Sequence, residues 1–245
     1  MKVTVVGFWG GYPEKNEATS SYLFEHEGFK LLVDCGSGAV AQLQNYVSPI
    51  DLDAMILSHY HHDHVADVGV LQYARLIQSY LGKDVPELPV YGHVYDENGF
   101  ARLEMPKVTK ALSYDLAHSK KIGPFTINFL ETKHPVTCFA MRITAAEQTV
   151  VYTADSSYME EFVSFSENAD LLICECNFYK EQDGTNAGHM NSKEAGQLAR
   201  KAKIKELMLT HLPHYGELEQ LVAEAKEQFG GRITLAKSGL VWGRE

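Results

Sequence analysis

Short apolar runs and alternating segments fill much of the first two thirds of the chain and predict β-strands. The expected strands cover residues 2–8, 19–26, 29–33, 54–57, 88–91, 125–131, 138–144 and 149–153. Between residues 65 and 81 the apolar positions instead recur at helical spacing, which predicts a helix with Val68, Leu71, Leu76 and Ile77 as its buried stripe.

Beyond residue 155 helical segments alternate with single strands. Helices are expected at 158–165, 192–203 and 217–229, with strands at 171–174, 206–209 and 232–235. Two shorter helices are expected at 39–46 and 96–103. Strand-rich blocks alternating with helices in both halves predict an α/β protein with two sheets and helices outside them. No linker-like segment interrupts the pattern, so we expect a single domain over residues 1–245.

Histidine and aspartate side chains cluster directly after the apolar run 54–57, in the stretch Ser58-His59-Tyr60-His61-His62-Asp63-His64. A tight loop between a strand and a helix can point His59 and His61 at one metal ion. Asp63 and His64 then face another. The alternative is a solvated histidine-rich loop in which Asp63 caps the following helix.

Three further candidate ligands also follow predicted strands, namely His134, Asp155 and His211. Together with the four in the loop, these nitrogen and oxygen donors are too many for one tetrahedral zinc ion but suit two that share a carboxylate. Zinc fits this donor set best, and Mn2+ or Co2+ also fits. Asp34, at the end of the strand 29–33, either orients a ligand histidine or forms a turn.

Composition and charge argue against some classes of function. A net charge of −10 and a pI near 5.6 argue against a protein that coats nucleic acid or anionic membranes through its overall field. No apolar run is long enough to span a bilayer, and the start of the chain is read as a strand rather than a signal peptide. The four cysteines have no disulfide-framework spacing. We therefore expect a soluble, cytoplasmic protein with free thiols and no membrane partner.

Several segments stand in the order typical of the metallo-β-lactamase superfamily: the 58–64 motif, the glycine-rich loop 7–13, the strand end 32–36, Thr153-Ala154-Asp155, Gly188-His189-Met190-Asn191 and Leu209-Thr210-His211. Within that superfamily the chain resembles ribonuclease Z and related phosphodiesterases. The resemblance implies a four-layer αβ/βα sandwich with two metal ions at the sheet edges, and a homodimer. It assigns His59, His61 and His134 to one ion, and Asp63, His64 and His211 to the other. Asp155 would bridge the two ions.

The resemblance also implies a reaction, which is hydrolysis of a phosphodiester by a hydroxide that two Zn2+ ions activate. Asp63 would hold its metal and accept a hydrogen bond from the nucleophile, and His189 would meet the scissile phosphate. For His189 the alternative is a helix-entry histidine bonded to backbone. The substrate would be an RNA 3′ end, as in tRNA maturation, or a small cyclic phosphate.

Two departures from ribonuclease Z limit the substrate assignment. The bacterial short form inserts a long tRNA-clamping arm between the residues that match His134 and Asp155, where this chain has room for only two strands. His214 stands where ribonuclease Z usually has a Ser/Arg/Tyr segment. Alternatives are therefore a cyclic-nucleotide phosphodiesterase, a thioester hydrolase of glyoxalase II type and a metal-stabilised binding module. Common β-lactamases are disfavoured, because they carry cysteine where this chain has Asp155.

Overall fold

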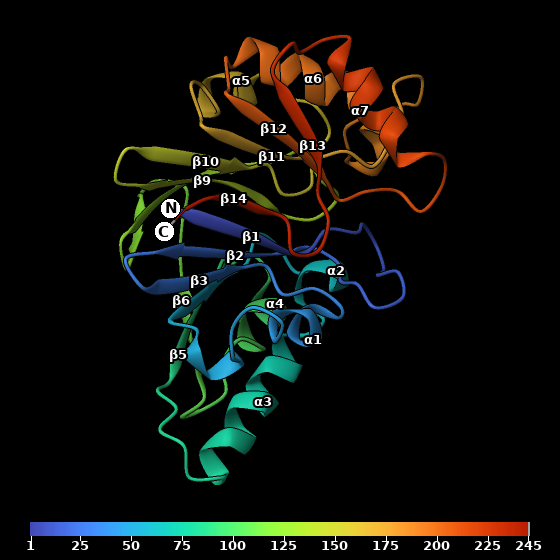
Figure 1. Cartoon of the computed structure of the whole chain (residues 1–245). Helices are drawn as coiled ribbons and strands as arrows, with labels where there is room; N and C mark the ends of the chain where they lie inside the picture. The colour runs from blue at the N-terminus through green and yellow to red at the C-terminus, as the bar shows by residue number, and fades with distance from the viewer. Residues whose placement is uncertain (245) are drawn as a thin grey trace. The chain divides into compact units, whose positions relative to one another are not determined.

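The computed structural model describes residues 1–244, which form two compact units. The first unit holds residues 1–115 and the C-terminal segment from Lys237, and the second holds residues 116–236. Each unit contains one seven-stranded mixed sheet and its own helices (Figure 1). The predicted α/β architecture of two mixed sheets flanked by helices is therefore confirmed.

The sheet of the first unit has the order β14-β1-β2-β3-β4-β5-β6. Its strands are β1 (Lys2–Gly7), β2 (Ser21–His26), β3 (Phe29–Val33), β4 (Ala54–Ile56), β5 (Leu88–Gly92), β6 (Thr109–Ser113) and β14 (Val241–Gly243). Strands β14 to β3 pair antiparallel, while β3, β4, β5 and β6 pair in parallel. Because parallel strands end at the same edge of a sheet, the residues after β3 and β4 are brought together.

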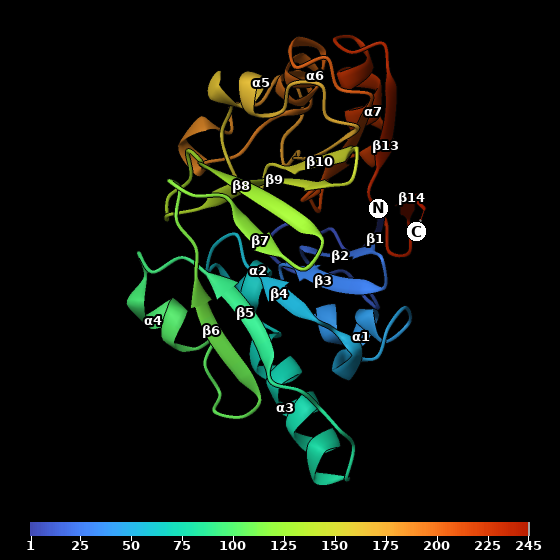
Figure 2. The same ribbon diagram turned by 90° about the vertical axis from the view of Figure 1, so that its left-hand side faces the viewer.

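Helices of the first unit follow the parallel strands and cover a core that includes Leu32, Met55 and Leu71 (Figure 2). They are α1 (Ala39–Leu43), the 3-10 turn η1 (Pro49–Asp51), α2 (His62–Val65), α3 (Val68–Tyr80) and α4 (Glu97–Ala101). Helix α2 begins inside the histidine motif itself, earlier than the helix start predicted at residue 65.

The buried face of α3 differs from the predicted stripe. Val68 and Leu71 are buried as expected, but Ile77 is 51% exposed and Arg75 is 1% exposed. Ile77 lies nine residues after Val68, which at 3.6 residues per turn places it on the opposite side of the helix. Arg75 can be buried because its guanidinium donates to the carbonyl oxygens of Pro49 and Pro86 at 2.7 and 2.6 Å.

The sheet of the second unit has the order β13-β12-β11-β10-β9-β8-β7. Its strands are β7 (Lys120–Ile122), β8 (Phe125–Glu131), β9 (Phe139–Ala145), β10 (Gln148–Tyr152), β11 (Leu171–Glu175), β12 (Glu206–Thr210) and β13 (Arg232–Leu235). Strands β10 to β13 run parallel, so the residues after β10, β11 and β12 meet at one edge.

Helices α5 (Glu161–Phe165), α6 (Ser192–Lys201) and α7 (Leu218–Lys226) lie along one face of this sheet (Figure 1). Helix α6 starts with a capping box, in which the Asn191 side chain accepts from the Glu194 amide and the Glu194 side chain accepts from the Asn191 amide. This capping fixes where α6 begins and therefore where the preceding segment, with His189, must end.

All four cysteines are free, as predicted, and all four are buried. Burial raises the pKa of the thiols of Cys35, Cys174 and Cys176 well above its usual value, so these side chains stay protonated. None of the helices among residues 1–244 combines the length and the apolar character needed to cross a membrane.

Candidate metal centre

The histidine motif forms a compact group of donors in the first unit. His59, Asp63 and His64 are buried, and His61 is half-buried. The ring of His59 lies 4.9 Å from that of His61 and 4.1 Å from that of His64, measured between centroids. The structure therefore brings together the four candidate ligands of this stretch.

The Asp34 side chain holds this group in place by hydrogen bonds. Its carboxylate is fully buried and accepts three hydrogen bonds, from the Ser58 amide at 2.7 Å, the Ser58 hydroxyl at 2.8 Å and His64 Nδ1 at 2.8 Å. Of the two roles that the sequence left open for Asp34, this contact fits the orientation of a candidate ligand histidine. A histidine that donates through Nδ1 presents the lone pair of Nε2 to a metal ion.

Ser58 extends the same arrangement to His59. Its hydroxyl donates to Asp34 and lies 3.0 Å from His59 Nδ1, so we assign the proton between them to His59. On the other side of the motif, the Gly11 amide donates to Asp63 Oδ2 at 2.8 Å. The glycine-rich loop therefore uses a backbone amide to hold a candidate ligand.

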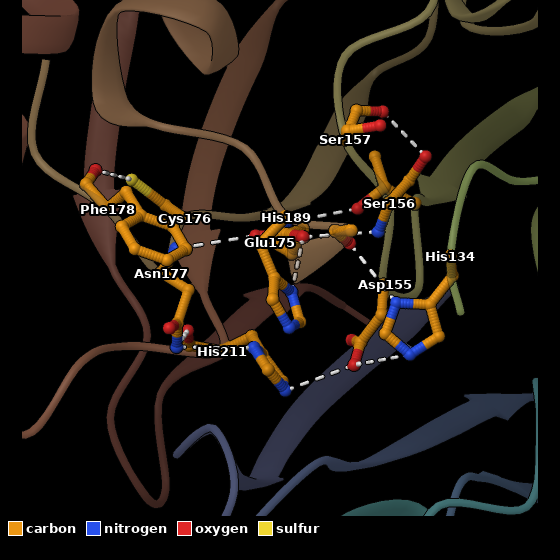
Figure 3. Close-up of polar contacts among 12 residues, drawn as sticks. His134, Asp155, Ser156, Ser157, Glu175, Cys176, Asn177, Phe178, His189 and His211 are labelled. Carbon is orange, nitrogen blue, oxygen red and sulfur yellow. Dashed lines mark hydrogen bonds and ion pairs between the residues drawn. The ribbon is translucent and has the colours of Figure 1, made fainter. Parts of the chain in front are cut away.

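The second unit gathers the other candidate ligands at the ends of its strands (Figure 3). His134 follows β8, Asp155 follows β10 and His211 follows β12. Asp155 Oδ2 lies 3.2 Å from His211 Nε2 and 3.9 Å from His134 Nε2. Two imidazole nitrogens thus converge on one carboxylate oxygen, as expected for Asp155 at the centre of a ligand set.

His134 is oriented by the loop that contains Gly188. Its Nδ1 lies 3.1 Å from the Gly188 carbonyl oxygen, which leaves Nε2 directed at Asp155. Gly188 has φ +77°, and a Cβ there would come within 2.9 Å of His134 Nδ1 and 2.6 Å of Pro135 Cδ. A glycine is therefore required for this approach.

His189 lies in the same group and is held by a residue that the sequence analysis did not identify. Its Nδ1 is 2.9 Å from Glu175 Oε1, and its ring stacks on His211 with centroids 5.0 Å apart. Glu175, the last residue of β11, is fully buried and accepts from the amides of Ser156 at 3.1 Å and Asn177 at 3.3 Å. A glutamate inside the apolar strand 171–175 is the signal that could have identified it.

Residues with a left-handed backbone conformation recur just after the strands that precede these side chains. Asp34 has φ +57°, Ala154 +50° and His211 +53°, although none is a glycine. Such conformations cost on the order of 1–3 kcal/mol each and persist where the surroundings over-determine them. Each turns the chain at the end of a strand, so that the side chain lies at the sheet edge.

Two other features drawn from the sequence are His214 and the cysteine pair Cys174 and Cys176. His214 is half-buried in the loop between β12 and α7. Cys174 and Cys176 are protonated interior thiols, which disfavours them as a zinc-binding pair. Histidine nitrogens and carboxylates thus provide the donors in both units, and this donor chemistry suits a divalent ion such as zinc.

Replacing Asp34 by asparagine tests its orienting role. Asp34→Asn keeps the size of the side chain and an acceptor for Ser58, but it places an amide nitrogen or a neutral oxygen against His64. We expect zinc affinity, measured by competition with a chelator, to fall about 10- to 100-fold. The exposed Asp84→Asn is the control and should bind zinc as the parent does. Unchanged affinity of Asp34→Asn would show that His64 needs no such partner.

Comparison with known proteins places this geometry in a family. Residues 30–212 match the Beta-lactamase superfamily domain. The probable metallo-hydrolase YhfI of Bacillus subtilis (strain 168) is 56% identical over 242 residues, which cover 99% of both chains. The crystal structure of YhfI, described as a metallo-beta-lactamase fold protein, matches with a TM-score of 0.97 at 57% identity over 98% of both chains.

More distant similarity extends to enzymes with named activities. A ribonuclease Z of Haloarcula marismortui is 26% identical over 299 residues, which cover 98% of this chain and 96% of that protein. A diphosphatase of the PhnP family shares the fold with a TM-score of 0.79 at 17% identity, over 100% of this chain and 98% of the other. The whole chain therefore belongs to the beta-lactamase superfamily, as a metallo-hydrolase relative of YhfI.

Proposed function

We propose that this protein hydrolyses phosphodiester bonds with two zinc ions. The observation that carries the proposal is the pairing of His189 with the buried Glu175, next to Asp155 and His211. An alkoxide leaving from phosphorus needs a proton or a positive charge, whereas a thiolate, with a pKa near 8.5, leaves without one. A carboxylate-backed histidine therefore favours phosphodiester hydrolysis over thioester hydrolysis.

The donors fit the metal ions that the family resemblance implies. We propose that His59, His61 and His134 hold one ion, that Asp63, His64 and His211 hold the other, and that Asp155 bridges them. The Nδ1 atoms of His64 and His134 face oxygen acceptors, which leaves each Nε2 as a ligand. Ions bound in this way supply Lewis acidity and lower the pKa of water toward about 7.

The protein's own residues would do the remaining work. Asp63, held by the Gly11 amide, would accept a hydrogen bond from the nucleophile. His189 would donate from Nε2 to the negative charge that develops on the phosphate or on the leaving oxygen. Glu175 would keep the proton of Nδ1 in place and so fix which nitrogen of His189 faces the substrate.

The connections between β8 and β10 bear on the substrate. Strand β9 starts at Phe139 after a short loop, and Ala146 and Glu147 form the whole turn between β9 and β10. The stretch from His134 to Asp155 thus contains no arm that could clamp a tRNA body. We propose an RNA 3′ end or a small cyclic phosphate as substrate, and the missing arm favours the small cyclic phosphate. Cyclic-nucleotide hydrolysis is the second candidate and thioester hydrolysis the third.

A parallel assay tests the reaction class together with the bridging ligand. Zinc-loaded protein is expected to hydrolyse bis(p-nitrophenyl) phosphate and to leave S-lactoylglutathione intact, with precursor tRNA and cyclic nucleotides assayed on the same sample. Asp155→Ala should lose bound zinc and turnover together, because it removes the shared carboxylate. Asp84→Ala is the exposed control. Two zinc ions per chain and full turnover in Asp155→Ala would refute the ligand assignment.

Substitutions of the His189–Glu175 pair test the catalytic assignment. His189→Ala should retain its zinc while turnover of bis(p-nitrophenyl) phosphate falls about 100-fold or more. The side-chain oxygen of Glu175→Gln can still accept a hydrogen bond from His189 Nδ1, so we expect a smaller loss. The exposed His118→Ala serves as the control. An unchanged rate in His189→Ala on this ester and also on cyclic nucleotides, whose leaving group is an alkoxide, would exclude His189 from the reaction if the zinc content is unchanged.

We also propose that the protein is a homodimer that pairs through α3. The outward face of this helix carries Val70, Tyr73, Ile77, Tyr80 and Leu81, which are 51–79% exposed. They recur at spacings of three and four, as residues of a helix–helix seam do. The only charged side chain of α3 itself, Arg75, points into the protein, so nothing charged opposes contact.

An antiparallel pair with its two-fold axis at Arg75 would set Tyr73 of one copy against Ile77 of the other. It would also bring Lys83 of one copy toward Asp67 of the other, which makes the face complementary to itself in charge. Ile77→Glu should convert the dimer to a monomer in size-exclusion chromatography with light scattering. Val136→Glu, at another exposed apolar residue, should not. A parent that elutes as a monomer would refute the pairing.

A further inference from the structure

A cavity of about 490 Å³ lies beside the histidine motif, within the first unit. It is bounded by α2, the start of α3 and α4, and its lining includes Tyr60, His62, Val68, Gly99, Arg102 and Leu103. Tyr60 and His62 alternate along the chain with the proposed ligands His59 and His61. The cavity therefore adjoins the loop on which the proposed chemistry depends, and its size is typical of small-molecule sites.

Part of the cavity wall is apolar and closely packed. Val68 and Leu103 are almost fully buried. The Tyr60 ring packs flat against Gly99, where a Cβ would lie 2.5 Å from the ring carbons. The Tyr60 hydroxyl donates to the His93 carbonyl oxygen at 2.7 Å, which holds the ring in place. A flat aromatic ligand could lie between this wall and the aliphatic side chains.

The rim is polar and open to a ligand. The side chains of His62, Asn98 and Arg102 are exposed and form no hydrogen bond or ion pair with other residues in the range 1–244. Asp96 differs, since its carboxylate caps α4 by accepting from the Gly99 amide at 2.9 Å. Three polar head groups thus surround an apolar interior without partners in the protein, as in sites that await a small molecule.

We propose that this cavity binds the nucleoside part of the substrate, an inference that rests on the proposed phosphodiesterase function. A nucleobase has two apolar faces and a polar edge, and the cavity pairs apolar walls with the Asn98 amide, which can donate and accept at once. Arg102 offers a planar cation that pairs with phosphate or stacks on a base. The volume admits one nucleoside, either from a cyclic or simple nucleotide or from the end of an RNA strand.

Gly69, in the first turn of α3, allows the cavity to be filled. It lines the cavity, and no atom lies within 4 Å of where its Cβ would be, so the Cβ of Gly69→Leu meets no other group. The test uses two substrates that differ only in the nucleoside: thymidine 5′-(p-nitrophenyl phosphate) and methyl p-nitrophenyl phosphate. The measured quantity is the ratio of kcat/KM for the first over the second.

We expect Gly69→Leu to lower this ratio at least tenfold, and Asn98→Ala to lower it in the same direction. Gly230→Leu, also at a glycine with open space around its Cβ, is the matched control and should leave the ratio unchanged. A ratio that stays at the parent value in both cavity variants would overturn the proposal. Circular dichroism melting of each variant verifies that it is folded.

A binding measurement separates failure of this inference from failure of the proposed function. In NMR titrations, AMP should shift the amide resonances of Gly99 and Asn98, whereas inorganic phosphate should not. Shifts with AMP in a protein that hydrolyses no phosphodiester would support the cavity and refute the function. Hydrolysis without such shifts would refute the cavity alone. Titration with 3′,5′-cyclic AMP and with a short RNA then distinguishes the two sources of the nucleoside.

Discussion

Two buried carboxylates, Asp34 and Glu175, tie together the ends of neighbouring parallel strands, one in each unit. Asp34 follows β3 and accepts from Ser58, which follows the adjacent strand β4. Glu175 ends β11 and accepts from Ser156, which follows the adjacent strand β10. Each carboxylate also receives the Nδ1 side of a histidine. Both units thus use the same arrangement, in which a buried carboxyl group that accepts hydrogen bonds from backbone amides sets the direction of an imidazole.

Left-handed residues at the strand ends complete that arrangement. A chain that continued straight past β3, β10 or β12 would carry its polar side chains beyond the sheet edge. The positive φ of Asp34, Ala154 and His211 turns the backbone at these points, at a cost in conformational energy that the surrounding hydrogen bonds offset. At Asp34 the left-handed backbone and the buried carboxylate coincide, whereas in the second unit the left-handed residues Ala154 and His211 are separate from the buried Glu175.

The sequence was informative wherever the signal was local. Alternating apolar residues and strand-end histidines predicted most elements and the two groups of donors. It failed where burial depends on distant partners. Arg75 is buried through the carbonyls of Pro49 and Pro86, which no helical periodicity reveals. Strand β14 forms because residues 241–243 pair with residues 2–4 at the other end of the chain. In the sequence Glu175 lies between Cys174 and Cys176, and only the fold shows its contact with His189.

The turn between β9 and β10 also has an evolutionary consequence. Ala146 and Glu147 join two antiparallel strands at an exposed tip, within the stretch where ribonuclease Z of the bacterial short form carries its arm. Lengthening a surface loop costs little, because closure entropy grows only logarithmically with its length. His134 and Asp155 follow the ends of β8 and β10 that lie away from this turn. An arm inserted at the turn would therefore not displace them. One hairpin tip could thus change the range of substrates while the catalytic centre stayed the same.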